Sequence, residues 1–154
     1  MLILLAGPSC SGKSAIAKKL QNIFNLKVHT GRDYMRFARN ISYSWNEFEK
    51  YCKSCSLSDI DKSSTVYIAT QHSKFEELAS IADLTIKCDA EQEVLEERFK
   101  PRTGGFLPPP VSMMIRRQKE LWNNVSFDLS LDTSDGDLEK NIGKVIEKIE
   151  SLRG

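Results

Sequence analysis

The feature that most constrains this chain is a short apolar run that leads directly into a glycine-rich octapeptide. Residues 2–6 (LILLA) are continuously apolar, which is typical of a strand buried on both faces of a parallel sheet. Residues 7–14 (GPSCSGKS) then match the pattern G-x-x-x-x-G-K-[ST] in full. After Lys13 the apolar residues recur at helical spacing, at Ile16, Leu20, Ile23 and Phe24. This order of strand, loop and amphipathic helix favours a ligand-binding loop over a glycine-rich turn that binds nothing.

The octapeptide, here called the phosphate loop, predicts a binding site for a nucleoside triphosphate. Its glycines let successive backbone N–H groups point at phosphate oxygens, and the helix that follows offers its positive end to the same anion. Lys13 is expected to reach the β and γ phosphates, and the Ser14 hydroxyl is expected to be a ligand of Mg²⁺. ATP and Mg²⁺ are therefore the predicted cofactors. The predicted nucleotide-binding residues are Gly7, Pro8, Ser9, Cys10, Ser11, Gly12, Lys13 and Ser14.

The rest of the chain alternates between strand-like and helix-like segments. Strands are expected at residues 2–6, 26–30, 65–69, 84–88 and 127–131. Helices are expected at residues 13–24, 34–38, 45–52, 75–82, 111–122 and 138–149. A further helix is expected to begin after Asp89, which would cap it with Gln92 in capping-box spacing, and to end before Pro101. The alternation predicts an α/β fold of three layers, α/β/α, in which helices cover both faces of a five-stranded parallel sheet. The 154 residues suit a single domain.

The charge balance and the lengths of the apolar runs limit the kinds of partner that this chain is expected to bind. The 22 basic and 21 acidic residues leave a formal net charge of +1, whereas a duplex-binding domain usually carries a marked basic excess. No nucleic-acid partner is therefore expected. No apolar run reaches the roughly 18 residues that a membrane span needs, and the N-terminal run is too short for a secretory signal. We expect a soluble cytoplasmic protein, either a monomer or a homodimer, that binds a nucleoside triphosphate and a small-molecule acceptor.

Beyond the phosphate loop, most of the chain resembles the small phosphate-loop kinases of the nucleoside monophosphate kinase superfamily, closest to the cytidylate-kinase-like group. The resemblance rests on residues 27–38 (KVHTGRDYMRFA), 44–51 (SWNEFEKY), 82–88 (ADLTIKC) and 127–134 (FDLSLDTS), the last of which ends in Asp-Thr-Ser. It implies the fold of the P-loop nucleoside triphosphate hydrolases, in its nucleotide-kinase form with a small lid. It also implies transfer of the γ-phosphoryl group of ATP.

The resemblance implies an acceptor site just beyond the second strand, at the carboxyl edge of the sheet. Arg36 would pair in a two-pronged way with an acceptor phosphate. Asp33 would hold a water of Mg²⁺ or accept the proton of the attacking oxygen. The alternative interpretation is that both are solvent-facing residues at a helix end.

A basic stretch near the middle of the chain predicts the lid, at about residues 99–118. Between Arg98 and Lys119 there are six basic residues and no acidic one, and the helices are separated by PRTGGFLPPP. Arginines that close over a moving phosphoryl group stabilise its charge and exclude water. The first candidates are Arg98 and Arg102, as catalytic residues beside Lys13 and Asp33, followed by Arg116 or Arg117 on the acceptor side. The alternative is a solvated basic loop.

Three functions remain open. The first is a nucleoside monophosphate kinase, with CMP or dCMP as acceptor. The second is a small-metabolite kinase, because residues 102–109 (RTGGFLPP) also resemble gluconate kinases; a sugar acid, a shikimate-like alcohol or an antibiotic would need a base such as Asp33. The third is a nucleotide-binding regulator without catalysis. It is favoured by residues 68–72 (IATQH), where no carboxylate follows the third strand to help place Mg²⁺.

Overall fold

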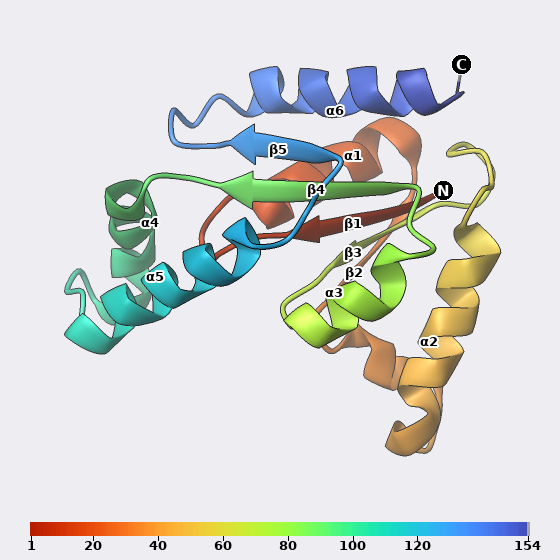
Figure 1. The fold of residues 1–154 in the computed structure, drawn as a ribbon, viewed down its shortest axis with the longest axis horizontal. Coiled ribbons are helices and arrows are strands. Elements are labelled where there is room, and N and C mark those ends of the chain that lie inside the picture. The colour runs from red at the N-terminus through yellow and green to blue at the C-terminus, as the bar shows by residue number, and fades with distance from the viewer. Residues whose placement is uncertain (154) are drawn as a thin grey trace.

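The five predicted strands all form, and they pair in parallel in the order β2-β3-β1-β4-β5. The computed structural model describes residues 1–153, and Figure 1 shows how they are arranged. The strands are β1 (Leu2–Ala6), β2 (Lys27–Thr30), β3 (Thr65–Ile68), β4 (Leu84–Asp89) and β5 (Leu129–Asp132). The helices are α1 (Lys13–Phe24), α2 (Ile41–Cys55), α3 (His72–Ala79), α4 (Gln92–Phe99), α5 (Pro109–Asn123) and α6 (Leu138–Arg153), with 3-10 helices η1 (Asp33–Phe37) and η2 (Lys100–Thr103).

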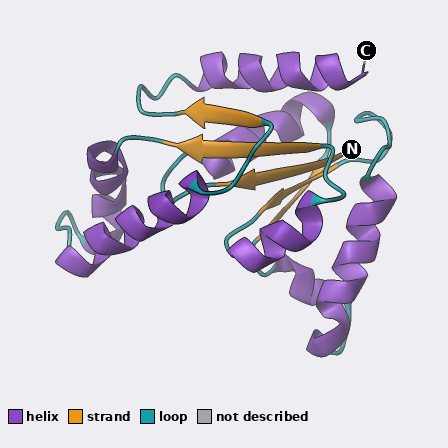
Figure 2. Cartoon of the chain, viewed as in Figure 1, coloured by secondary structure: helices purple, strands orange, loops and turns teal. Residues whose placement is uncertain are grey.

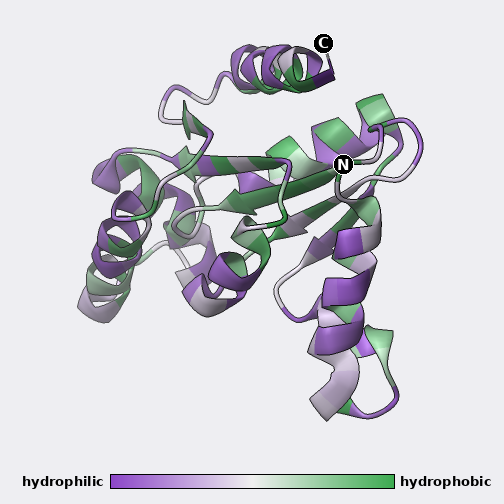
Figure 3. Cartoon of the chain, turned by 45° about the vertical axis from the view of Figure 1, so that its right-hand side comes forward, coloured by the Kyte–Doolittle hydropathy of each residue, from purple (hydrophilic) through white to green (hydrophobic). Residues whose placement is uncertain are grey.

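The central strand β1 joins two hydrophobic cores. Ile3 and Leu5 pack in the core that α1 and α6 cover, whereas Leu2 and Leu4 pack in the core that α2, α3 and the end of α5 cover. All five residues of β1 are fully buried, which explains why the run has no polar alternation. The strands all point the same way (Figure 2), and apolar residues colour the middle of the sheet (Figure 3). The predicted three-layer α/β/α architecture is confirmed.

The segment between β2 and β3 differs in detail from the prediction. The expected helix at residues 34–38 is the 3-10 helix η1, and the expected helix at 45–52 is the longer α2. Helix α2 starts earlier because Asn40 caps it: its side chain accepts a hydrogen bond from the backbone N–H of Ser42, 3.1 Å away. Its apolar face then buries Phe48 and Cys52 against the sheet.

The prediction that Asp89 caps the following helix was wrong. Asp89 is the last residue of β4, and α4 begins at Gln92 after Glu91, which makes no side-chain cap. The Asp89 carboxylate instead accepts from the backbone N–H of Ala90 at 2.8 Å and from Lys119 Nζ at 2.9 Å. The ammonium on α5 offers this carboxylate a charged partner that sequence spacing alone does not reveal.

The predicted lid region begins with η2 and a glycine loop, and continues into α5. Gly104 and Gly105 both have positive φ, 72° and 90°, so the loop turns sharply after η2. Helices α4 and α5 pack together around Leu95 and Ile115, beyond the arrowhead of β4 in Figure 1. Helix α5 extends past the predicted lid boundary and reaches the second core through Trp122. Of the helices within residues 1–153, none is both long enough and apolar enough to cross a bilayer.

Candidate functional site

The phosphate loop connects the carboxyl end of β1 to the start of α1, and its glycines are required by its geometry. Gly7 has φ 146° and Gly12 has φ 93°, both values that residues with a side chain avoid. A Cβ atom on Gly7 would lie 1.9 Å from the carbonyl oxygen of Cys88 on β4. Close packing of loop backbone against strand backbone therefore excludes any side chain at this position. The loop is held curled at the N-terminus of α1, where an anion is stabilised.

The Lys13 side chain folds back across the phosphate loop. Its ammonium donates hydrogen bonds to the carbonyl oxygens of Gly7 at 2.6 Å and Pro8 at 2.9 Å. The pKa of Lys13 is lowered from its ordinary value to about 8, mainly by burial of the ammonium and to a smaller extent by the positive charge of Arg102. The Lys13 ammonium therefore stands at the loop, where it can turn toward an anion, and the catalytic role of Arg102 stays a prediction.

Arg98 fastens the phosphate loop to the segment that follows β5. Its guanidinium donates to the carbonyl oxygen of Cys10 and to Thr133 Oγ1, each at 3.1 Å, and also to the carbonyl oxygen of Thr133. Arg98 belongs to α4 rather than to the glycine loop of the lid. Arg98 therefore links the phosphate loop to the segment after β5 through hydrogen bonds. Direct contact of Arg98 with phosphates stays a prediction.

Two further contacts to the loop were not predicted from sequence. Gln118 on α5 accepts a hydrogen bond from the backbone N–H of Ser9, at 2.8 Å through its Oε1. The hydroxyl of Thr133 donates to the carbonyl oxygen of Ser11 at 2.8 Å. Thr133 belongs to the Asp-Thr-Ser segment, so the sequence contained a signal for it, whereas Gln118 follows two arginines in the chain and matches no motif. Both side chains fix the loop conformation.

A cavity of about 200 Å³ adjoins the outer side of the phosphate loop. Its wall comes from the loop, the first turn of α1, α4 and the start of α6, and is mainly apolar. Pockets for whole drug-sized ligands measure about 300–1,000 Å³, so this smaller volume suits a single flat ring system. The lining residues are Cys10, Gly12, Ala15, Ile16, Arg98, Thr133, Gly136, Leu138 and Asn141.

The predicted acceptor residues are less closely assembled. Asp33 opens η1 directly beyond β2, and its Oδ2 accepts from the backbone N–H of Thr30 at 2.8 Å. Arg36, Arg116 and Arg117 are exposed and form no hydrogen bond or ion pair with any residue in the range 1–153. Arg102 lies over the ring of Phe99, 5.2 Å from its centroid. The acceptor roles of these residues stay predictions.

The donor set around the loop suits a metal that arrives with a nucleotide. Among residues 1–153, His, Cys, Asp and Glu form no group of three or more that could hold a metal ion alone. The Ser14 side chain is exposed, and its hydroxyl has no hydrogen-bond partner in the same range. Magnesium is commonly held by one or two protein ligands together with phosphate oxygens and water. The Ser14 hydroxyl offers one such ligand, and the roles of Ser14 and Asp33 toward Mg²⁺ stay predictions.

Comparison with known proteins identifies the fold. No protein-family model matches the sequence, and no curated protein matches it. An uncharacterized protein from Eubacterium ventriosum ATCC 27560 has a TM-score of 0.72 at 16% identity, with 98% of this chain and 99% of that one covered. YorR from Bacillus subtilis, in complex with phosphorylated GDP, has a TM-score of 0.68 at 16% identity, with 97% and 96% covered. A gluconokinase from Sinorhizobium meliloti 1021 has a TM-score of 0.66 at 16% identity, with 98% and 94% covered. The chain therefore has the fold of small phosphate-loop kinases over 97–98% of its length.

Proposed function

We propose that this protein is an ATP-dependent phosphotransferase that moves the γ-phosphoryl group to a small-molecule acceptor. The observation that carries the proposal is the complete phosphate loop, in which Gly7 is sterically required and the Lys13 ammonium is held across the loop. A partly buried loop of this kind, at the N-terminus of a helix and with a partly desolvated ammonium, is an arrangement for binding a triphosphate. The likeness of the fold to a gluconokinase supports the same chemistry.

Each part of the loop has a role in this proposal. The backbone N–H groups bind phosphate oxygens, and Lys13 exchanges the carbonyls of Gly7 and Pro8 for the β and γ phosphates. Ser14 would hold Mg²⁺, which when bound neutralises charge on the phosphates. Arg102 would close over the γ-phosphoryl group from the lid. The ring-sized cavity beside the loop would take the nucleotide base, with Arg98 in its wall.

The identity of the acceptor distinguishes two candidate functions. A nucleoside monophosphate carries a phosphate that Arg36, exposed and unpaired within residues 1–153, would bind. CMP or dCMP is the first to test. A small metabolite instead offers a hydroxyl that must lose a proton, which Asp33 would accept. The fold's likeness to a gluconokinase favours this second candidate.

A panel of nucleoside monophosphates, sugar acids and shikimate-like alcohols, with release of ADP as readout, separates the two candidate functions. Tight nucleotide binding with no transfer to any acceptor would instead indicate a non-catalytic protein.

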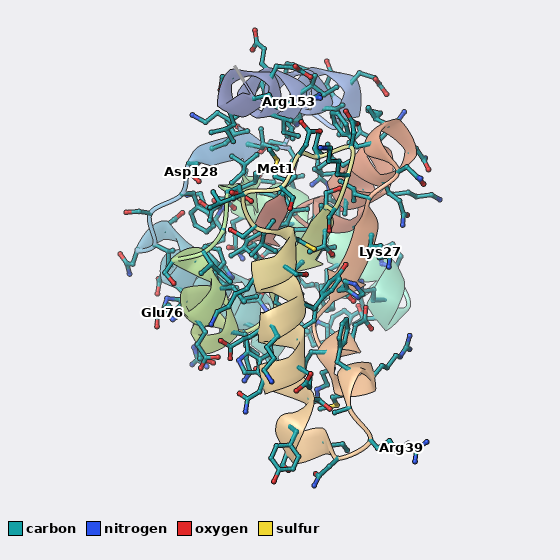
Figure 4. All side chains as sticks on the ribbon, turned by 90° about the vertical axis from the view of Figure 1, so that its right-hand side faces the viewer. Met1, Lys27, Arg39, Glu76, Asp128 and Arg153 are labelled. Carbon is teal, nitrogen blue, oxygen red and sulfur yellow. The ribbon has the colours of Figure 1, made fainter. Side chains whose placement is uncertain are left out.

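Substitution of Asp33 and Arg36 gives opposite results for the two acceptor classes. With a hydroxyl acceptor, we expect Asp33→Asn to lower kcat about 100-fold, since a general base contributes about 10²–10⁴-fold. With a phosphate acceptor, whose oxygen is already ionised at neutral pH, Asp33→Asn should change kcat little, and Arg36→Ala should raise the acceptor KM at least tenfold, roughly the worth of a charge-assisted hydrogen bond. The control is Arg39→Ala, because Arg39 projects from the outer tip of the molecule (Figure 4). Equal effects of the Arg36 and Arg39 variants would contradict the placement of the phosphate.

Nucleotide binding should weaken as the pH rises, because Lys13 loses its proton easily in the free protein. Its pKa is about 8 when unliganded, and bound phosphates favour the charged form. Above that pH, binding must take up a proton, so the dissociation constant of the Mg²⁺ nucleotide should rise by up to about tenfold per pH unit. Calorimetric titrations in buffers of different ionisation enthalpy measure both the affinity and the proton uptake. An affinity that stays constant from about pH 7 to pH 10 would argue against an ammonium contact with the phosphates.

A further inference from the structure

The side-chain amide of Gln118 on α5 contacts the phosphate loop through only one of its two ends. Its oxygen Oε1 accepts a hydrogen bond from the backbone N–H of Ser9 at 2.8 Å. Because a backbone N–H can only donate, the end of the amide that meets the loop is the oxygen, and the NH2 group, Nε2, is the other end. Nε2 has no hydrogen-bond partner within residues 1–153 and is not buried. Gln118 therefore keeps two free donor hydrogens that a ligand can reach.

Bond geometry places this NH2 group beside the start of the phosphate loop. The nitrogen and the oxygen of an amide lie about 2.2 Å apart, so Nε2 lies within about 5 Å of the Ser9 nitrogen. The Ser9 N–H and the Pro8 carbonyl belong to one peptide group, and this carbonyl accepts from the Lys13 ammonium at 2.9 Å. Lys13 and Gln118 therefore flank the same peptide group, Lys13 at its carbonyl and Gln118 at its N–H.

The course of the loop indicates which phosphate of a bound triphosphate would lie beside this peptide group. This step rests on the proposed function, because it concerns the nucleotide that the loop would hold. The N-terminus of α1, at the far end of the loop, is the place for the β phosphate. The Lys13 ammonium, which would contact both the β and γ phosphates, reaches back to the carbonyls of Gly7 and Pro8. The γ-phosphoryl group would therefore lie beside residues 7–9, within reach of the Gln118 NH2 group.

The part of α5 that carries Gln118 is held in place by its neighbours. Lys119, the next residue, donates to Asp89 Oδ1 at the end of β4, 2.9 Å away. One turn further along α5, Trp122 is buried and packs edge-to-face on Phe75 of α3, with the ring centroids 5.5 Å apart. A donor that is fixed before the reaction stabilises developing charge without having to reorganise.

We propose that Gln118 is a catalytic residue of the transfer, whose Nε2 donates a hydrogen bond to an oxygen of the γ-phosphoryl group while its Oε1 stays on the Ser9 N–H. In the reaction, the bond from the γ phosphorus to the β–γ bridging oxygen breaks and a bond to the acceptor oxygen forms. Gln118 exchanges no proton in this step, and its amide stabilises negative charge on the moving group. ADP lacks the γ-phosphoryl group, so Gln118 contributes to the binding of ATP and not to that of ADP.

Two substitutions separate this contact from a purely structural role of Gln118. In Gln118→Ala both ends of the amide are lost, whereas in Gln118→Glu an oxygen can still accept from Ser9 and the donor is replaced by a negatively charged oxygen. Calorimetric titrations with Mg²⁺-ATP and Mg²⁺-ADP give the affinity for ATP relative to ADP. We expect this ratio to fall about tenfold in the alanine variant, the worth of a hydrogen bond to a charged group. In the glutamate variant it should fall at least about 100-fold, because repulsion between like charges is added.

The matched control is Gln21→Glu, which makes the same change of charge at an exposed position of α1 and should keep the ratio of the unaltered protein. With the acceptor that the panel identifies, kcat should decrease from the unaltered protein to Gln118→Ala and further to Gln118→Glu. A residue that only supports the loop would give the reverse order, because glutamate keeps the contact with Ser9.

The outcomes distinguish this inference from the proposed function. If the unaltered protein binds neither nucleotide, the proposed function is wrong. If it binds both and Gln118→Glu keeps the normal ratio of ATP to ADP affinity, only the role of Gln118 is wrong. The glutamate variant decides the question even if the alanine variant does not fold, since it retains the hydrogen bond from Ser9.

Discussion

Replacing Lys13 by alanine is expected to reduce phosphoryl transfer by about 100-fold or more, the usual loss when one preorganised charge-stabilising donor is removed. The ammonium bridges the carbonyl oxygens of Gly7 and Pro8 and is partly desolvated, and it would exchange these carbonyls for the β and γ phosphates. Its bonds in the free protein are to groups that water can also satisfy once the side chain is gone. The fold should therefore persist, with a melting temperature within about 3 °C of the unaltered protein, less than the shift that 1–2 kcal/mol would produce.

The comparison for this variant is Lys18→Ala. Lys18 lies on the same helix α1, is exposed and forms no side-chain hydrogen bond or ion pair with any residue in the range 1–153. Transfer rates and thermal melting of both variants should be measured with the acceptor that the panel identifies. Lys13→Ala with at least half of the normal turnover, or a loss of turnover equal to that of Lys18→Ala, would remove Lys13 from the proposed mechanism.

Replacing Gly7 by alanine is expected to destabilise the whole domain. The added methyl group would lie 1.9 Å from the carbonyl oxygen of Cys88, and the φ of 146° is one that alanine rarely adopts. Overpacking costs about 1–3 kcal/mol and an unfavourable backbone region about 1–3 kcal/mol more. Together these take a large part of the roughly 5–15 kcal/mol that stabilises a typical domain. We expect a melting temperature at least about 10 °C lower, or a protein that does not fold at all.

Gly143→Ala is the matched control for this substitution. Gly143 lies in α6, and a Cβ atom there would meet no atom within 4 Å. Alanine is favoured over glycine in a helix by about 1 kcal/mol, so this variant should be as stable as the unaltered protein or slightly more stable. Thermal melting followed by circular dichroism compares the two. Equal melting temperatures for the Gly7 and Gly143 variants would show that the loop backbone relaxes away from β4.

The local conformation of several segments could be predicted from the sequence, whereas contacts between residues far apart in the chain could not. The apolar run at residues 2–6 and the phosphate loop each specify their conformation within a few residues, so both could be predicted. The start of α2 was missed because the capping role of Asn40 depends on where its side chain points. Asp89 was assigned to the next helix because the competing ammonium of Lys119 lies 30 residues away in sequence. Contacts of that kind appear only when the chain is folded.

The same distinction applies to the candidate site. The loop residues could be identified from spacing, since the chemistry of phosphate binding requires glycines, a lysine and a hydroxyl at fixed positions. The bracing of the loop by Arg98 could not, because it depends on α4 meeting the segment after β5. Gln118 was missed for a similar reason: a glutamine in a basic helix carries no signal until the helix is docked on the loop.

Calorimetric titration of Mg²⁺-ATP into the unaltered protein and into Lys13→Ala, at about pH 7, where the Lys13 ammonium is still protonated, tests the central claim most directly. The account predicts saturable binding of one nucleotide per chain by the unaltered protein. It also predicts affinity at least about tenfold weaker for the variant, the worth of one charge-assisted hydrogen bond. Absence of any association with the unaltered protein at millimolar nucleotide, or equal affinity for both proteins, would contradict it.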